Sequence, residues 1–243
     1  MNSDFSHTYT DDIQIAYSDV GPDLRLQLGA LFRHLYQVTL NHRKVQGQDI
    51  QSTRKLGMGW FVRKMLFTLE TYPEYENIVR IETRISGVHG IRLYREYDIS
   101  LGKNRIGHLI SEWVYMDLEA RRPRPVAESI INPPAVYDTS TIAEWKPPTI
   151  PSNPEICAIS VRSGDFDSNG HVNNTTYIDY LETACHRSLT ERHHIRQCNI
   201  AFLQEIPPDT DAVEVAFSKD GSTVHFQMSA GAAHFAAGEL VFS

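Results

Sequence analysis

One ten-residue stretch in the second half of the chain combines side chains that suit acid–base and carbonyl chemistry. Residues 165–174 contain two aspartates, three asparagines and one histidine. Carboxylates and imidazoles can activate a water molecule, and amides can polarise a carbonyl oxygen. An amphipathic run beginning near Tyr177 follows, so the stretch would lie at a helix N-terminus, where free N–H groups favour negatively charged oxygens. The loop is therefore a candidate catalytic or ion-binding site.

A calcium site is one interpretation of these residues. The pattern Asp-x-Asp-x-Asn-Gly, from Asp165 to Gly170, matches the opening of an EF-hand loop. The twelfth position is Thr176, however, where such loops place a bidentate glutamate. Without that ligand the loop lacks its main source of calcium affinity. We therefore expect no metal here, and nothing else in the sequence calls for a cofactor.

Turn formation and helix capping are a second interpretation. Asp, Asn and Gly are favoured turn residues, and Asn173 or Asn174 is a natural N-cap for the helix that follows. This explains the asparagines of the loop. It does not explain His171 or the second carboxylate, so a catalytic loop stays open as the third interpretation.

The elements that would position this loop occur twice. A proline-rich stretch, residues 126–154, separates residues 1–125 from residues 155–243 and is expected to be an extended linker. Hydrophobic periodicity predicts one strand, one helix and then four strands in each half. In the first half these are residues 8–15, the helix 23–39, and the strands 60–70, 78–86, 91–100 and 106–115. In the second half they are residues 156–161, the helix 177–189, and the strands 199–206, 212–218, 223–229 and 233–242.

A helix of this length can bury its apolar face against the concave side of a curled antiparallel sheet. The sequence therefore predicts an α+β protein in which this unit occurs twice in one chain. The repeat is architectural, because the two halves share little residue identity.

Composition and charge narrow the class of protein. Of the 243 residues, 41% are hydrophobic and 22% are charged, which is typical of a soluble globular protein. The net charge of -7 argues against a nucleic-acid partner. No apolar run is long enough to span a membrane, and the N-terminus resembles no export signal. Cys157, Cys185 and Cys198 lack C-x-x-C spacing, so we expect reduced thiols, no zinc site and a cytoplasmic protein.

The loop and its surroundings resemble a known family. The string Asp-Ser-Asn-Gly-His-Val-Asn-Asn-Thr-Thr-Tyr, residues 167–177, is similar to the signature of the hotdog-fold acyl-ACP thioesterases. Residues 200–205 resemble the strand that carries a further acidic residue in that family. In the first half, the strand that begins Gly59-Trp60 and the run 111–114 before residues 121–123 are similar as well. The resemblance covers nearly the whole chain and implies two tandem hotdog domains.

The resemblance implies hydrolysis of fatty acyl-ACP to free fatty acid and carrier protein. Its catalytic set, carried over by position, consists of Asp167, Asn169, His171 and Glu205. Glu205 would be a general base or a carboxylate nucleophile, and the sequence leaves both mechanisms open. His171 would share the base role or orient the water. Asn169 would hold the thioester or the water through its amide. Asp167 would position Asn169 or His171, or be the nucleophile itself. The backbone N–H of Asn174 would polarise the thioester carbonyl.

Two features of the sequence refine this expectation. Plant members have a cysteine directly after the acidic residue, and here that position is Ile206, so we expect a reaction without a cysteine nucleophile. The first half offers no counterpart to the Asp-Asn-His loop, since residues 17–21 occupy the matching place. That half would shape the acyl pocket, with Leu28, Leu31, Phe32 and Leu35 as candidate lining residues.

The expected partners are a fatty acyl thioester and acyl carrier protein. Because the carrier is acidic, this protein would need a local basic patch on its surface to bind it. One candidate cluster consists of Arg121, Arg122 and Arg124, and the other of Arg187, Arg192, His193, His194 and Arg196. A homodimer is one expected assembly, because hotdog edges often pair. An acyl-CoA thioesterase and a module that binds acyl thioesters without hydrolysing them are the alternative functions.

Overall fold

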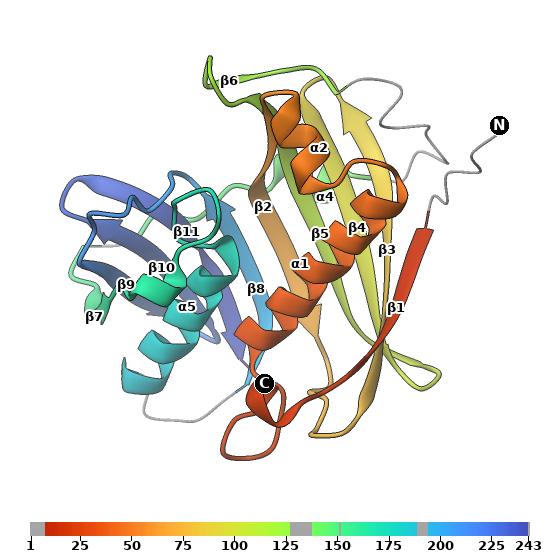
Figure 1. Cartoon of the computed structure of the whole chain (residues 1–243). Helices are drawn as coiled ribbons and strands as arrows, with labels where there is room; N and C mark the ends of the chain where they lie inside the picture. The colour runs from red at the N-terminus through yellow and green to blue at the C-terminus, as the bar shows by residue number, and fades with distance from the viewer. Residues whose placement is uncertain (1–7, 127–137, 151, 189–193, 243) are drawn as a thin grey trace, which may run out of the picture.

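The computed structural model describes residues 8–126, 138–150, 152–188 and 194–242, and it contains one large antiparallel sheet (Figure 1). The strand order is β1-β3-β4-β5-β2-β8-β11-β10-β9-β7, and β6 pairs with β5. The first-half strands are β1 (Thr8–Gln14), β2 (Met58–Leu69), β3 (Ile78–His89), β4 (Arg92–Leu101), β5 (Asn104–Asp117) and β6 (Arg122–Pro123). The second-half strands are β7 (Glu155–Ser160), β8 (Ile195–Phe202), β9 (Ala212–Asp220), β10 (Thr223–Ala230) and β11 (Ala233–Phe242).

Each half of the sheet carries one long helix, which confirms the predicted α+β architecture. Helix α1 (Leu28–Val45) packs on the first half, and α5 (Asn174–Ser188) packs on the second. Leu31, Leu35 and Val38 recur at helical spacing and are at most 2% exposed, so one face of α1 is buried as its periodicity predicts. The helix begins five residues later than predicted, because Leu24 adopts a left-handed conformation within the preceding turn.

The two half-sheets are continuous, a feature that the sequence did not predict. Strands β2 and β8 pair antiparallel, with Lys64 opposite Ala201 and Thr68 opposite Gln197. The two sheet-and-helix units are therefore joined edge to edge by main-chain hydrogen bonds, and they share one hydrophobic core.

The two long helices also contact each other. Arg33 of α1 forms an ion pair with Asp179 of α5 at 2.7 Å. Glu182 of α5 accepts hydrogen bonds from the N–H groups of Leu28 and Gly29, at 2.7 and 2.9 Å. Gly29 leaves room for the Asp179 carboxylate at this crossing, because a Cβ atom there would force that side chain to move.

The strand before Glu205 ends earlier than the sequence predicted. The prediction placed it at residues 199–206, whereas β8 ends at Phe202. The Leu203 N–H still bonds to the Phe235 carbonyl, and the chain then leaves the sheet ahead of two prolines that carry no N–H. Glu205 therefore lies on a connection just beyond the strand, and its predicted place on a strand was wrong.

Two short helices were also not predicted. Helix α2 (Ile50–Lys55) follows α1, with Asp49 as its N-cap. Helix α4 (Ser140–Glu144) lies within the proline-rich stretch, of which residues 127–137 and 151 are outside the described part. It is held to the sheet by buried Ile142 and by Lys64, whose Nζ donates to the carbonyl of Trp145 at 2.8 Å. Within the described ranges, no helix has the length and apolar character needed to cross a membrane.

Candidate active site

The loop that the sequence singled out is a tight, self-bonded turn at the start of α5. The Asp167 N–H bonds to the His171 carbonyl at 2.9 Å, and the Gly170 N–H bonds to the Asp167 carbonyl at 3.0 Å. Gly170 has φ +81°, a backbone conformation that residues other than glycine rarely adopt. Asn173 Oδ1 accepts the Thr175 N–H at 2.9 Å, which is the capping role predicted for this residue.

Asp167 and Asn169 form one hydrogen-bonded unit. The backbone N–H of Asn169 donates to Asp167 Oδ1 at 2.7 Å, and Asn169 Nδ2 donates to Asp167 Oδ2 at 3.2 Å. Arg54, at the end of α2, donates from Nη2 to Asn169 Oδ1 at 2.7 Å and to the Ser168 carbonyl at 2.7 Å. Because a guanidinium only donates, the Asn169 amide must turn its oxygen toward Arg54 and its nitrogen toward Asp167. In this structure Asp167 orients Asn169.

His171 and Glu205 form the second unit of the site. His171 Nε2 lies 3.2 Å from Glu205 Oε2, and the two side chains are 29% and 31% exposed. Both groups can therefore reach water and a substrate. Arg121 approaches the same oxygen at 3.4 Å, but its side chain is 77% exposed, so this pair contributes little stability.

Tyr177 fixes the backbone on both sides of Glu205. Its hydroxyl donates to the Gln204 carbonyl at 3.3 Å and accepts the Ile206 N–H at 3.2 Å. Burial raises the pKa of Tyr177, and the nearby charges of Glu205 and Asp167 raise it further. The hydroxyl thus stays protonated and lies within electrostatic reach of both carboxylates.

An apolar cavity borders the start of α5. Its first-domain wall includes Phe32, Leu35, Val62, Met65, Leu109 and Trp113, and Asn174 and Thr175 belong to the same lining. Of the four candidate lining residues, Phe32 and Leu35 therefore face this space. Leu28 and Leu31 are buried in the core and do not belong to the lining.

The loop at residues 165–174 has a counterpart with the same backbone contacts in the first domain. Three backbone contacts recur with the same spacing in both loops. They are Gly21–Arg25, Val20–Leu26 and Gln27–Asp19 in the first domain, and Asp167–His171, Phe166–Val172 and Asn173–Asp165 in the second. The predicted place of the matching segment, residues 17–21, was wrong, because these contacts put residues 21–25 opposite 167–171. The side chains still differ, since Gly21, Asp23 and Arg25 stand where the second loop has Asp167, Asn169 and His171. The backbone conformation is therefore duplicated, and the candidate catalytic side chains are not.

This duplication separates structural residues from candidate catalytic ones. Asp165 is 4% exposed, accepts the Arg162 N–H at 2.8 Å, and accepts the Tyr180 hydroxyl at 2.6 Å. Asp19 makes the matching pair of contacts, with the Ala16 N–H at 3.1 Å and with His34 Nε2 at 3.0 Å. An aspartate that occurs in both loops with the same contacts belongs to the fold.

The start of α1 also shows what the start of α5 can bind. By loop position, Leu28 and Gly29 correspond to Asn174 and Thr175. The first pair of N–H groups holds the Glu182 carboxylate. At α5 the Thr175 N–H is capped, whereas the Asn174 N–H makes no hydrogen bond within the described chain. That N–H is therefore available to an oxygen atom in the adjoining cavity.

The cysteines lie away from this chemistry. Cys198 is fully buried on β8, and burial raises its pKa. Burial likewise raises the pKa of Cys185 to about 12. A buried thiol with a raised pKa is a poor nucleophile. Among the described residues, no cluster of three metal-ligating side chains is present.

Arg54 and Tyr177 are the site residues that the sequence analysis missed. Tyr177 stood in the matched string, but the sequence analysis used it only as the start of the amphipathic helix. Arg54 had no local signal, since it lies more than a hundred residues before the loop and reaches it through the contact between domains. The candidate docking residues Arg192 and His193 lie outside the described part of the chain.

Comparisons with known proteins agree with this architecture. Residues 6–133 match the acyl-ACP thioesterase N-terminal domain, and residues 151–236 match the C-terminal domain. A dodecanoyl-acyl-carrier-protein hydrolase of Cinnamomum camphora is 25% identical over 84% of this chain and 58% of its own length. An oleoyl-acyl carrier protein thioesterase of Arabidopsis thaliana is 22% identical over 89% of this chain and 66% of its own length. The chain thus spans little more than half to two thirds of these curated relatives.

Solved structures share the fold along the whole chain. An acyl-ACP thioesterase from Bacteroides thetaiotaomicron superposes with a TM-score of 0.81 at 19% identity and covers 100% of both chains. The 12:0-ACP thioesterase from Umbellularia californica gives 0.83 at 22% identity over 98% of both chains. These likenesses confirm the tandem hotdog fold. With both domain models matched in order, this chain belongs to the acyl-ACP thioesterase family.

Proposed function

We propose that this protein hydrolyses fatty acyl-ACP to free fatty acid and carrier protein. The observation that carries the proposal is the His171–Glu205 pair at 3.2 Å, beside a helix N-terminus that borders an apolar cavity. Thioester hydrolysis needs an activated water, a polarised carbonyl and a place for the acyl chain. The His171–Glu205 pair would activate the water, the helix N-terminus would polarise the carbonyl, and the apolar cavity would hold the acyl chain.

In the proposed reaction, Glu205 acts as the general base. It removes a proton from a water molecule as the water oxygen attacks the carbonyl carbon of the thioester. His171 holds the carboxylate in place and orients the water. The Asn174 N–H donates to the developing oxyanion, as the matching N–H groups of α1 do to the Glu182 carboxylate. When the intermediate collapses, the carbon–sulfur bond breaks and the proton on Glu205 passes to the leaving thiolate.

Asn169 is assigned to positioning the thioester. Its oxygen is engaged by Arg54 and one of its amide hydrogens by Asp167. The second amide hydrogen remains to hold the substrate or the attacking water. Since Asp167 is occupied by two hydrogen bonds from Asn169, we favour the base mechanism at Glu205 over nucleophilic attack by Asp167.

The carrier protein is proposed to dock on the side of the molecule that carries Arg121. Of the two basic clusters, this one reaches the site, because Arg121 contacts Glu205. Arg187 belongs to the last turn of α5, about 20 Å from its start at 1.5 Å per residue. A carrier that approaches from the Arg121 side delivers its thioester directly to the His171–Glu205 pair.

The proposal is tested by following thiol release from purified protein with acyl-ACP and acyl-CoA, from octanoyl to octadecanoyl chains. Release from acyl-ACP with a higher kcat/KM than from acyl-CoA is the expected result. Release from CoA alone would replace the carrier-protein assignment with an acyl-CoA thioesterase. No release from any thioester would leave a module that only binds.

A further inference from the structure

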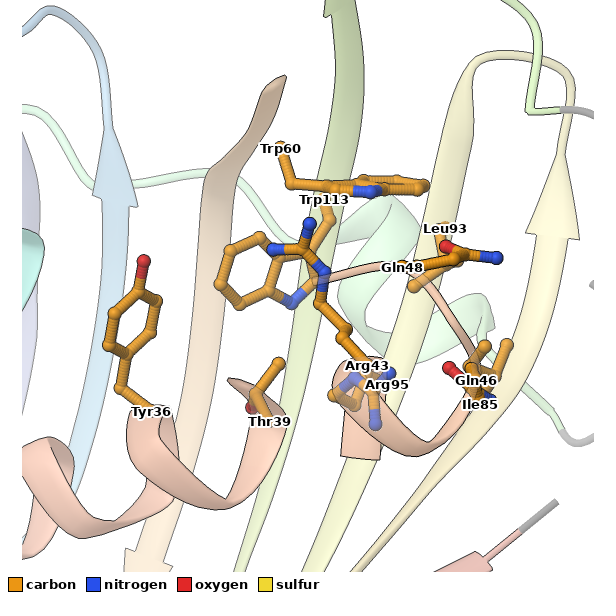
Figure 2. A pocket seen from close by; sticks show the side chains of 10 residues that line it. All are labelled: Tyr36, Thr39, Arg43, Gln46, Gln48, Trp60, Ile85, Leu93, Arg95 and Trp113. Carbon is orange, nitrogen blue, oxygen red and sulfur yellow. The ribbon is translucent and has the colours of Figure 1, made fainter. Parts of the chain in front are cut away.

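A second cavity lies in the first domain, between α1 and strands β2, β3, β4 and β5 (Figure 2). It shares Tyr36 and Trp113 with the apolar cavity, so these two side chains stand at the junction of the two spaces. Their rings stack at 6.4 Å with an interplanar angle of 16°. Beyond them the lining changes character, because Arg43, Arg95 and two glutamines join it.

Arg95 is a buried cation that pairs with no carboxylate of the described residues. It is 2% exposed, and its Nη1 donates to His42 Nδ1 at 2.9 Å and to Thr83 Oγ1 at 3.2 Å. Both acceptors are neutral, since a ring nitrogen that accepts from a guanidinium carries no proton. No ion pair is formed by Arg95 within the described chain. Burying a charge without a counter-ion is costly, so this arrangement favours an anion in the adjoining space.

Arg43 adds a second cation and unused donors at the same cavity. Its Nη2 donates to Thr53 Oγ1 at 3.3 Å, while its Nε atom is buried and has no partner in the part of the chain that the structure describes. The indole Nε1 of Trp60, also in the lining, is buried and unpartnered as well. Burial lowers the pKa of Arg43, and the charge of Arg95 lowers it further. Among the described residues, neither arginine is paired with a carboxylate, and Arg43 Nε and Trp60 Nε1 have no acceptor.

We propose that this second cavity binds a carboxylate at the far end of the acyl chain, so that the substrates include ω-carboxyacyl thioesters. The inference rests on the proposed thioesterase function and specifies its substrate class. Arg43 lies three turns beyond Phe32 on α1, about 16 Å at 1.5 Å per residue. A chain whose thioester lies at Asn174 would cross the apolar cavity, pass Tyr36 and Trp113, and present its far end to the two arginines.

The same carboxylate chemistry could come from a free fatty acid, the product of the reaction. In that case the acid would enter with its head group at the arginines, and the acyl chain of the substrate would never need a polar end. If the cavity binds the far end of the acyl chain, the enzyme should prefer a thioester with a terminal carboxylate. If the cavity binds the free product, it should show no such preference, and the experiment below separates the two cases.

The test compares dodecanedioyl-ACP with dodecanoyl-ACP for the wild type, Arg95→Met, Arg43→Met and the control Arg63→Met. Arg63 is an exposed arginine on β2 that lines neither cavity. We expect the wild type to hydrolyse the dicarboxylic chain with a kcat/KM at least equal to that of the plain chain. Arg95→Met and Arg43→Met should each lower this ratio about tenfold or more, the usual effect of losing a hydrogen bond to a charged group. Arg63→Met should leave the ratio unchanged.

A wild-type ratio far below one, or a ratio that neither arginine variant changes, would overturn the assignment. If neither thioester releases thiol, the proposed function fails, and calorimetry with free dodecanedioic and dodecanoic acids then judges the cavity by itself. Tighter binding of the diacid that is lost in Arg95→Met supports the site, and equal binding of the two acids overturns it. Binding of dodecanoic acid that depends on Arg95, together with an unchanged thioester ratio, would assign the cavity to the product and overturn the acyl-chain proposal.

Discussion

The hydroxyl of Tyr177 offers a sharp test of how Glu205 is positioned. Tyr177→Phe removes one oxygen atom, which bonds to the backbone on both sides of Glu205. The Ile206 N–H is then left buried without a partner, since Ile206 is 0% exposed. An unsatisfied buried donor costs about 1–3 kcal/mol, and in a chain of this size each kcal/mol lowers Tm by about 2–4 °C. We therefore expect a loss of Tm of roughly 2–12 °C.

The effect on catalysis should exceed what stability alone explains. Freeing the 204–206 segment lets Glu205 shift relative to the thioester, and a misplacement of about 1 Å can cost about a hundredfold in rate. We expect kcat for dodecanoyl-ACP to fall about 10- to 100-fold, with KM little changed, at a temperature where the variant is fully folded. Steady-state thiol release and differential scanning calorimetry measure the two quantities.

The matched control is Tyr180→Phe. The Tyr180 hydroxyl donates to buried Asp165 at 2.6 Å, away from Glu205, so its loss should lower Tm at least as much while kcat stays within a fewfold of the wild type. Wild-type kcat in Tyr177→Phe, or an equal loss of kcat in the two variants, would refute the positioning role of Tyr177.

Arg54→Met should lower kcat about tenfold, because it releases the Asn169 amide. Lys55→Met, the neighbouring position on α2, should leave kcat unchanged. Equal kcat values in the two variants would contradict the role of Arg54 in positioning Asn169. Cys198→Ala should keep full activity, because the thiol is fully buried and burial raises its pKa. A large loss of kcat in a folded variant would instead support a cysteine nucleophile. Burial opposes ionisation of Asp165, but hydrogen bonds from a buried tyrosine and a neighbouring arginine outweigh it and lower its pKa. A lowered folded-state pKa stabilises the protein above the ordinary aspartate pKa of about 4 and loses this effect as pH falls through the folded value. Urea titrations should therefore show Asp165→Asn costing stability at neutral pH and progressively less below pH about 4, and a cost independent of pH would refute the assignment.

Periodicity predicted the helices and strands well, because their buried faces follow the regular spacing of a helix or a strand. The points where helices and strands begin and end were predicted less well, because they depend on local backbone conformation. Helix α1 begins late because Leu24 takes a left-handed turn, and β8 ends early because Leu203 and Gln204 both donate to the single carbonyl of Phe235 instead of continuing the ladder. Neither cause is visible in hydrophobic patterning. The pairing of β2 with β8 was equally hidden, since an edge strand and a paired strand share the same alternation.

The candidate site divides in the same way. Asp167, Asn169 and His171 lie within one turn, so their proximity follows from the sequence. Glu205 was expected from the resemblance to a family, and the structure places it against His171. Arg54 could not have been found from the sequence, because its contact depends on how the two domains meet. The duplicated loop backbone was also hidden, since it is held by main-chain hydrogen bonds that share no side chains.

The proposed base at Glu205 is tested most directly by single-turnover thiol release from dodecanoyl-ACP with Glu205→Gln, beside the exposed control Glu119→Gln. The substitution keeps the shape of the side chain and removes its ability to take a proton from water. The account predicts a loss of about 10²- to 10⁴-fold in the rate of the chemical step, with an unchanged Kd for the substrate and full activity in the control. Release at the wild-type rate by Glu205→Gln would contradict the assignment of Glu205 as the base.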